Sequence, residues 1–246
     1  LSSGRQGPEF YQAMWRSINE TSAWEGEIWN RRKSGEVFPE WLSISAVRDG
    51  FGRVSNYVAS LTDISEHKAA EDQIKHLAFF DALTGLPNRR LLLDRLQQAQ
   101  AASARKGKFA ALMFLDLDNF KNVNDLHGHQ TGDQLLCLVA ERLSHAIRSC
   151  DTVARLGGDE FVVLLEDLEP HSEDAAGQVE GIGQTILQAL EAPYLIGELE
   201  LRSTASIGVL LFNDELVDSH ELMKRADLSM YEAKAAGKNA LRFFDP

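Results

Sequence analysis

The stretch ARLGGDEFVV (residues 154–163) places two glycines and two carboxylates between two apolar segments. The flanking segments TVARL (152–156) and FVVLLE (161–166) are rich in β-branched and aromatic residues, which predicts two strands joined by a tight turn. Glycine readily adopts the backbone conformations that such a turn requires. The hairpin therefore presents the acids Asp159 and Glu160 at its turn, where they repel each other.

A second acidic pair follows an apolar run. Residues 110–115 predict a buried central strand, and Asp116 and Asp118 alternate with Leu117 at its end, so both acids face the same side. If the hairpin pairs near this strand, Asp116 and Asp159 converge, and a divalent cation would remove their mutual repulsion. Each acid alone fits a solvated turn residue. Together with the glycine pair, they predict a Mg²⁺ site that leaves positions for phosphate oxygens.

The chain from residue 81 onward alternates helical and strand patterns. Pro87 is a suitable first-turn residue for the first of these helices. Such alternation predicts an α/β (α+β) fold in which helices pack on a central sheet. The predicted helices are residues 88–107, 132–149, 174–191 and 219–237, and the further predicted strands are 203–212 and 240–244.

The first 66 residues follow a different pattern. Residues 23–29, 37–47 and 53–63 are rich in aromatic and β-branched side chains and are separated by KSGE and RDGFG, which predicts antiparallel hairpins. The segments WEGEIWNRRKSGEVFPEWLSISAV and VSNYVASLTDISE resemble the C-terminal half of a PAS sensor domain. A purely structural hairpin layer fits the same residues. We assign residues 1–66 to the C-terminal part of a PAS domain with an antiparallel sheet.

Residues 67–80 predict a helical linker between the two regions. The segment has few strand-forming residues, and Thr62 or Asp63 could cap the start of the helix. Apolar residues recur at Ile74 and Leu77. A polar connecting helix and a short coiled coil that pairs two chains both fit, because the apolar seam is too short for heptads to decide.

The charge and composition narrow the class of protein. The net charge is −12, and residues 1–66 hold seven Lys and Arg against nine Asp and Glu, which leaves −10 for the rest. Such an acidic surface argues against DNA binding, which needs a basic face. No apolar run approaches the ~20 residues of a membrane helix. We expect a cytoplasmic domain in which Cys137 and Cys150 are reduced thiols. Because the chain begins with Leu1, we expect a longer full-length protein, whose membrane anchoring the sequence leaves open.

Several motifs in the second region resemble the GGDEF family, the diguanylate cyclases. They are LDLDNFKNVND, GHQTGD, RLGGDEF, SIGV and ADLSMYEAKAAGKN, and DALTGLPNRR is similar to the opening of that family. The resemblance covers residues 79–246, and we assign the domain to residues 81–246. It implies a palm-like nucleotidyl-cyclase sheet and an enzyme that condenses two GTP into cyclic di-GMP and releases pyrophosphate.

The resemblance also implies the catalytic groups. Asp116, the Leu117 carbonyl and Asp159 would hold Mg²⁺, with Mn²⁺ as an alternative. The ion would lower the pKa of the attacking ribose 3′-hydroxyl and neutralise charge on the α-phosphate. Glu160 would be a second metal ligand or a group behind the ligands, and Asp159 or Glu160 could be the general base. Lys121 is a further candidate catalytic residue.

The family's substrate-binding residues match positions in this chain. Asn124 and Asp133 would read guanine, because a carboxylate accepts its adjacent N1–H and N2–H₂ donors together, whereas adenine presents a bare N1 acceptor. Considered alone, Asn124 fits a turn residue and Asp133 a helix N-cap. Gly157 and Gly158 would let phosphate approach the backbone. The triphosphate would be held by three lysines, two of which also suit a helix C-terminus: Lys121, Lys234 and Lys238.

The family also implies assembly and feedback. Because one domain holds one GTP and the product is symmetric, two domains must meet as a homodimer. Arg148 and Asp151 form an RxxD stretch with five residues between Asp151 and Gly157, a spacing that marks an inhibitory product-binding site in the family. An Arg and an Asp three apart could also form a weak surface pair.

Two other roles are compatible with these residues. A GGDEF domain can bind GTP or cyclic di-GMP without turnover, although such domains usually carry a degenerate GGDEF stretch, whereas this one is intact. The RFFDP ending resembles the junction to a phosphodiesterase (EAL) domain. If a phosphodiesterase follows in the full-length chain, the present domain could serve it as a regulator that senses GTP.

Overall fold

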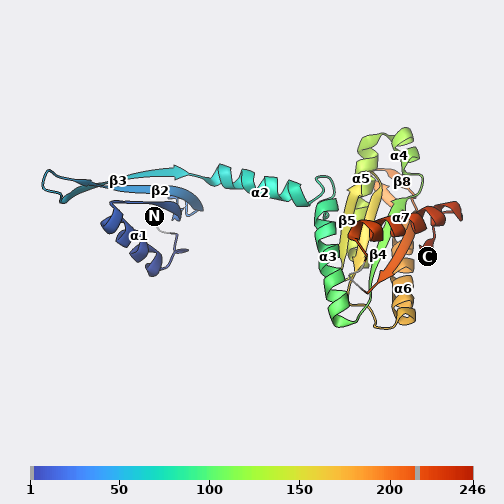
Figure 1. The fold of residues 1–246 in the computed structure, drawn as a ribbon. Coiled ribbons are helices and arrows are strands. Elements are labelled where there is room, and N and C mark those ends of the chain that lie inside the picture. The colour runs from blue at the N-terminus through green and yellow to red at the C-terminus, as the bar shows by residue number, and fades with distance from the viewer. Residues whose placement is uncertain (1–2, 214–216, 246) are drawn as a thin grey trace. The chain divides into compact units, whose positions relative to one another are not determined.

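The computed structural model describes residues 3–213 and 217–245 (Figure 1). They form two compact units, which divide between His76 and Leu77. None of the helices in these ranges combines the length and the apolar character needed to cross a bilayer.

The first unit is a three-stranded antiparallel sheet with one helix packed on it. In order across the sheet, its strands are β1 (Ala23–Arg31), β2 (Val37–Arg48) and β3 (Val54–Asp63). Helix α1 (Pro8–Thr21) buries Met14 and Ile18 against β1 and β2. The antiparallel sheet confirms the sequence prediction. Helix α1 was not predicted from the sequence; its first turn contains Pro8, and its start has no capping side chain.

Helix α2 (Ser65–Phe79) follows β3 directly. Of the two predicted caps, Asp63 is the one that accepts the Ser65 N–H, at 2.9 Å. Ile74 and Leu77 are both exposed. Pairing of two chains through this helix therefore stays a prediction.

The second unit is built on a five-stranded sheet with the order β10-β9-β4-β6-β5. The central strand β4 (Ala110–Leu117) is buried along its whole length and pairs antiparallel with both neighbours. The remaining strands of the sheet are β5 (Thr152–Gly157), β6 (Glu160–Leu165), β9 (Ala205–Phe212) and β10 (Leu241–Phe243). A separate hairpin is formed by β7 (Tyr194–Ile196) and β8 (Leu199–Leu201).

Helices cover both faces of this sheet (Figure 1). They are α3 (Arg89–Lys106), α4 (Phe120–His127), α5 (His129–Ala146), α6 (Ser172–Glu191) and α7 (Ser219–Ala235). On β4, Leu112 and Phe114 pack in the cluster with α3 and α7, whereas Met113 and Leu115 pack in the cluster with α5 and α6. By this alternation Asp116 belongs to the α7 side of the sheet.

Helix α7 packs very closely on β9 at Gly208. A Cβ atom at residue 208 would lie 2.1 Å from the Ala226 carbonyl oxygen and 2.2 Å from the Met230 amide nitrogen. Both atoms belong to the backbone of α7, so a side-chain rotation cannot relieve the clash. Glycine at 208 therefore sets the distance between the helix and the sheet.

We predict that Gly208→Ala destabilises the second unit by about 1–3 kcal/mol, the usual cost of overpacking. Gly177→Ala is the matched control, because Gly177 is exposed within α6 and a Cβ there meets nothing within 4 Å. The control should be neutral or stabilising by up to about 1 kcal/mol.

Urea unfolding followed by circular dichroism at 222 nm measures both variants. All four tryptophans lie at residues 15, 24, 29 and 41, so their fluorescence follows the first unit and should not change. A Gly208→Ala protein with the parent's unfolding midpoint would show that α7 can move away from β9 at little cost.

Candidate active site

The glycine turn joins β5 and β6 at one end of the sheet. Gly157 pairs with Glu160, so Gly158 and Asp159 are the two turn residues. The φ angles of Gly157 and Gly158 are 144° and 54°, in the range that side chains with a Cβ rarely adopt. The two glycines are therefore required by the turn, as the sequence predicted.

The turn lies beside the end of β4. Asp116 is the register partner of Glu160, and the Leu117 N–H donates to the Asp159 carbonyl at 3.4 Å. Asp116 and Asp159 therefore come from neighbouring strands and meet at the same edge, which agrees with the convergence expected from the sequence.

The charges at this edge are crowded. Burial, together with Asp159 and Asp118, raises the pKa of Asp116 although the Lys234 ammonium lies 2.6 Å from its Oδ1. Burial and the neighbouring Asp227 likewise raise the pKa of Glu160. Burial is the larger cause of both shifts and neighbouring carboxylates add to it, so a cation at this edge would stabilise the charged form of both side chains.

Asp118 has a structural task that the sequence reading did not assign. Its buried carboxylate accepts hydrogen bonds from Thr204 Oγ1 at 2.6 Å, Ser206 Oγ at 2.7 Å and the Asn239 N–H at 3.0 Å. It thus ties the end of β4 to β9 and to the loop that carries Lys238. The Lys238 ammonium in turn donates to Asn119 Oδ1 at 2.7 Å.

Arg155 is a second residue whose role the sequence reading missed. Its buried guanidinium donates twice to the Gly158 carbonyl, at 2.8 and 3.1 Å, and contacts Asp81 Oδ1 at 2.8 Å. Burial alone would raise the pKa of Asp81, but hydrogen bonds from Thr84 and Arg155 outweigh it and hold the pKa below its usual value. The DALTGL segment is therefore fastened to the glycine turn, and the arginine of ARLGGDEF is the signal that could have indicated this.

The predicted guanine-reading residues lie where α4 meets α5. Asn124 is on α4, and its Oδ1 would lie 2.0 Å from a Cβ on Gly132, the residue before Asp133. The absence of a Cβ at Gly132, which lies within α5, thus makes room for the Asn124 side chain. Asp133 is the fifth residue of α5, so the interpretation as an N-cap is wrong, and Asn124 is helical instead of in a turn.

A cavity of about 490 Å³ opens beside Asp133. Leu83 and Leu138 supply apolar walls, Gln134 lies at its edge, and the Cys137 thiol donates to the Leu83 carbonyl at 3.4 Å. Cys137 and Cys150 are both free thiols. Lys121 is exposed in the first turn of α4.

The donor set at the sheet edge suits a hard divalent cation. Asp116 and Asp159 offer carboxylates and Leu117 a backbone carbonyl, and oxygen ligands of this kind are those that Mg²⁺ prefers. Within residues 3–213 and 217–245, no three His, Cys, Asp or Glu side chains are arranged to hold a metal. Further ligands would therefore have to come from substrate phosphates or water.

The RxxD residues lie at the opposite end of β5. Asp151 is buried, and its carboxylate accepts the Arg148 N–H at 3.1 Å and the Glu166 N–H at 3.2 Å. The Arg148 side chain is half exposed, with its Nε 3.9 Å from Asp151. Arg148 also lines a cavity of about 260 Å³ together with Arg95. Asp151 thus holds the backbone at Arg148 and Glu166 in place. Only the Arg148 side chain is exposed, so the alternative of a weak surface pair fits Arg148 but not the buried Asp151.

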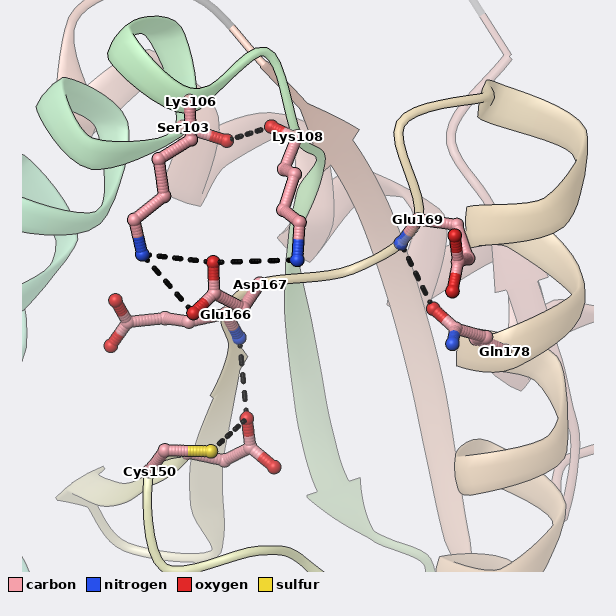
Figure 2. A network of polar contacts seen from close by, with 9 residues as sticks. Ser103, Lys106, Lys108, Cys150, Glu166, Asp167, Glu169 and Gln178 are labelled. Atoms are coloured by element: carbon pink, nitrogen blue, oxygen red, sulfur yellow. Dashed lines mark hydrogen bonds and ion pairs between the residues drawn. The ribbon is translucent and has the colours of Figure 1, made fainter.

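The polar contacts around this end are shown in Figure 2. Asp167 follows Glu166 and binds Lys106 through both carboxylate oxygens, at 2.9 and 3.1 Å. Lys108 lies 3.9 Å from the same carboxylate. These ion pairs hold the segment that follows β6. The same segment contains Glu166, whose N–H donates to the Asp151 carboxylate.

The family comparison agrees with this geometry. A family model described as "Diguanylate cyclase, GGDEF domain" matches residues 78–240. The chain belongs to the GGDEF family. A PAS domain model matches residues 3–66 of the same GGDEF protein.

Relatives of this GGDEF protein include longer signalling proteins. It is 48% identical over 176 residues to the "Bifunctional diguanylate cyclase/cyclic di-GMP phosphodiesterase MucR" of Pseudomonas aeruginosa, covering 72% of this chain and 25% of MucR. It is 33% identical over 226 residues to the "Cyclic di-GMP phosphodiesterase PdeR" of Escherichia coli, covering 92% of this chain and 33% of PdeR. The chain thus spans only a quarter to a third of these relatives.

Solved GGDEF domains have the same fold. The GGDEF domain of YfiN from Pseudomonas aeruginosa matches with a TM-score of 0.62 and 34% identity, covering 68% of this chain and 94% of that one. The coiled coil and GGDEF domain of DgcB from Caulobacter crescentus, solved in complex with c-di-GMP, match with a TM-score of 0.63 and 27% identity, covering 73% and 93%.

We predict that Arg155→Met lowers the free energy of unfolding of the second unit by about 1–3 kcal/mol at pH 7, because Asp81 and Gly158 lose a buried donor. The depressed pKa of Asp81 stabilises the fold above its unfolded value of 3.8, and this contribution is lost as the pH falls below it. The difference between parent and variant should therefore shrink in acid.

Urea unfolding followed by circular dichroism at pH 7 and at pH 3 measures this difference. Arg105→Met, on the exposed surface of α3, is the control and should match the parent at both values of pH. A difference that stays constant with pH would show that Arg155 stabilises the turn without Asp81.

Proposed function

We propose that this protein is a diguanylate cyclase that condenses two GTP into cyclic di-GMP with release of pyrophosphate, and that the reaction requires Mg²⁺ or Mn²⁺. The observation that carries the proposal is the meeting of Asp116 and Asp159 at one sheet edge, with the Lys234 ammonium beside them. An acidic edge with a glycine turn and a nearby lysine suits a metal-bound triphosphate.

The residues at the sheet edge would have different roles in the reaction. Asp116, Asp159 and the Leu117 carbonyl would hold the cation, which when bound lowers the pKa of the ribose 3′-hydroxyl and neutralises charge on the α-phosphate. Asp159 and Glu160 are the candidates for accepting the hydroxyl proton, and Glu160 could also be a further ligand. Gly157 and Gly158 allow phosphate to approach the turn, where no Cβ intervenes.

The base and the triphosphate would be held on either side of this edge. Asn124 and Asp133 would accept from the guanine N1–H and N2–H₂ groups, and the cavity beside Asp133 has room for a purine. Lys121, Lys234 and Lys238 would bind the triphosphate as compact cations. A site that leaves such acceptors unpaired with adenine discriminates strongly between the two bases.

The product requires two sites to face each other. One set of these residues binds one GTP, so we propose a homodimer in which each domain presents its 3′-hydroxyl to the partner's α-phosphate. Residues 1–66 and the linker helix would control this approach. We propose the domain boundaries 1–66, 67–80 and 81–246 for the sensor, linker and cyclase, in a domain that works in the cytoplasm.

A regulatory module without turnover is the second candidate. It is favoured by the name of PdeR, a cyclic di-GMP phosphodiesterase that aligns with 92% of this chain. In that case the domain would bind GTP or cyclic di-GMP and act on a phosphodiesterase domain elsewhere in a longer protein. The intact GGDEF stretch favours the cyclase.

We predict that incubation with GTP and Mg²⁺ yields cyclic di-GMP and that Asp159→Asn lowers the rate by at least about 100-fold, because the metal loses an anionic ligand. Chromatography of the nucleotides measures the rate. Asp94→Asn, a substitution of an exposed acid on α3, is the control and should keep the parent rate. GTP binding without product in the parent would favour the regulatory module.

We also propose that cyclic di-GMP inhibits the enzyme at the RxxD site. Arg148 and Arg95 both line the cavity there, and two guanidinium groups suit a phosphodiester. The Asp151 carboxylate would have to exchange one of its backbone hydrogen bonds for the guanine. Arg148 is therefore the better residue to substitute, since Asp151→Asn would also disturb the fold.

We predict that Arg148→Ala raises the half-inhibiting concentration of cyclic di-GMP by about tenfold or more, the effect of losing one charge-assisted hydrogen bond. Initial rates at increasing product concentrations measure this, with Arg105→Ala as the control. Equal inhibition of parent and variant would place the inhibitory site elsewhere.

A further inference from the structure

Lys234 and Asp116 form an ion pair at the catalytic edge. The Lys234 Nζ lies 2.6 Å from Asp116 Oδ1, and the two side chains are 31% and 13% exposed. Lys234 was expected to bind phosphate, yet its ammonium lies on the carboxylate that is the expected metal ligand. The Lys234 ammonium is thus a cation, supplied by the protein itself, that pairs with Asp116.

Asp116 needs a positive charge whether or not a metal is bound. It is mostly buried, and Asp159 and Asp118 lie close enough to act on it electrostatically. A carboxylate removed from water among other acids is costly unless a cation compensates it. Among the ion pairs of the described residues, Lys234 is the cationic partner of Asp116.

The packing of α7 on the sheet places Lys234 beside Asp116. Lys234 follows Met230 by four residues, about 6 Å along α7. Met230 contacts the sheet at Gly208, whose β4 partner is Phe114, and Asp116 lies two residues, about 7 Å, further along β4. The close packing at Gly208 thus brings the last turn of α7 over the acidic edge.

The ammonium and a divalent cation cannot share this oxygen. Mg²⁺ binds carboxylate oxygens at about 2.0–2.1 Å, and a second cation within hydrogen-bond distance of the same oxygen would be strongly repelled. A metal that binds Oδ1 therefore displaces Lys234 from Asp116. Its side chain is long and flexible, and it is attached to the end of a helix, so it can turn toward a ligand nearby.

We infer that Lys234 is an internal counter-ion of the metal site, which leaves Asp116 when the cation binds and then pairs with the triphosphate. The inference rests on the proposed function, because that function makes Asp116 a metal ligand. Without nucleotide, the displaced ammonium loses its ion pair with Asp116, and the metal binds weakly. With nucleotide, Lys234 gains the phosphate, so metal and GTP bind cooperatively and each strengthens the other by the same factor.

Titration of Mn²⁺ in the absence of nucleotide tests the exchange, with free Mn²⁺ measured by electron paramagnetic resonance. We expect Lys234→Met to bind Mn²⁺ at least about fivefold more tightly than the parent, the lower end of usual coupling between sites. Lys234→Arg keeps a cation and should stay close to the parent. Lys224→Met removes an exposed lysine on the same helix and is the control for net charge.

The same titration with a non-hydrolysable GTP analogue measures the coupling. In the parent the analogue should tighten Mn²⁺ binding. In Lys234→Met the analogue should tighten it less, and the reduction should equal the factor by which Lys234→Met tightens Mn²⁺ binding without nucleotide. Circular dichroism shows that each variant is folded, and Lys234→Gln serves as a second neutral substitution. Mn²⁺ affinity that is unchanged or weaker in both neutral variants would overturn the counter-ion role.

The GTP assay separates this inference from the proposed function. If the parent forms cyclic di-GMP but the neutral variants bind Mn²⁺ no more tightly than the parent, Lys234 is not a counter-ion of the metal site, and its role is limited to phosphate binding. If the parent forms no cyclic di-GMP but the neutral variants bind Mn²⁺ more tightly, the exchange is supported and the cyclase assignment is wrong.

Discussion

The close approach of α7 to β9 at Gly208 is the contact on which the acidic edge at the end of β4 depends. It fixes the helix by backbone atoms at Ala226 and Met230, so the helix position does not rely on flexible side chains. The following turn of α7 then carries Lys234 to Asp116. The placement of Lys234 over an acidic strand end is therefore a consequence of helix–sheet packing, and a larger residue at 208 would displace both the helix and the lysine.

Two buried polar residues hold the other sides of this edge. Asp118 uses three donors to join β4, β9 and the loop that carries Lys238. Arg155 joins the DALTGL segment to the glycine turn through Asp81 and the Gly158 carbonyl. Both side chains are buried and hydrogen-bonded, so breaking either contact leaves a polar group without a partner, which is costly. The edge is thus held by networks that involve all of its elements.

The sequence predicted the parts of this site that depend on local pattern. The apolar run of β4 and the glycines at 157 and 158 indicated a buried strand and a tight turn, and both are present. Helix α4 was missed because KNVND is polar and short, and its helical state depends on packing against α5. The roles of Asp118 and Arg155 were missed for a related reason. Their partners lie 74 to 121 residues away in sequence, or are backbone atoms. The arginine in ARLGGDEF indicates a polar contact near the turn, but no local pattern identifies the partners of either residue.

The contacts at this edge also bear on how a chain with a net charge of −12 would hold a triphosphate, as the proposed function requires. Four acids lie at this edge, and two of them have compensating partners within the chain. Asp118 is satisfied by neutral hydrogen-bond donors and Asp116 by the Lys234 ammonium, whereas Asp159 and Glu160 lie half-buried at the turn. A cation that bound Asp116 and Asp159 would release Lys234 for the phosphate. The acidic edge would then attract the anionic nucleotide, because the metal reverses its charge and frees a lysine in the same step.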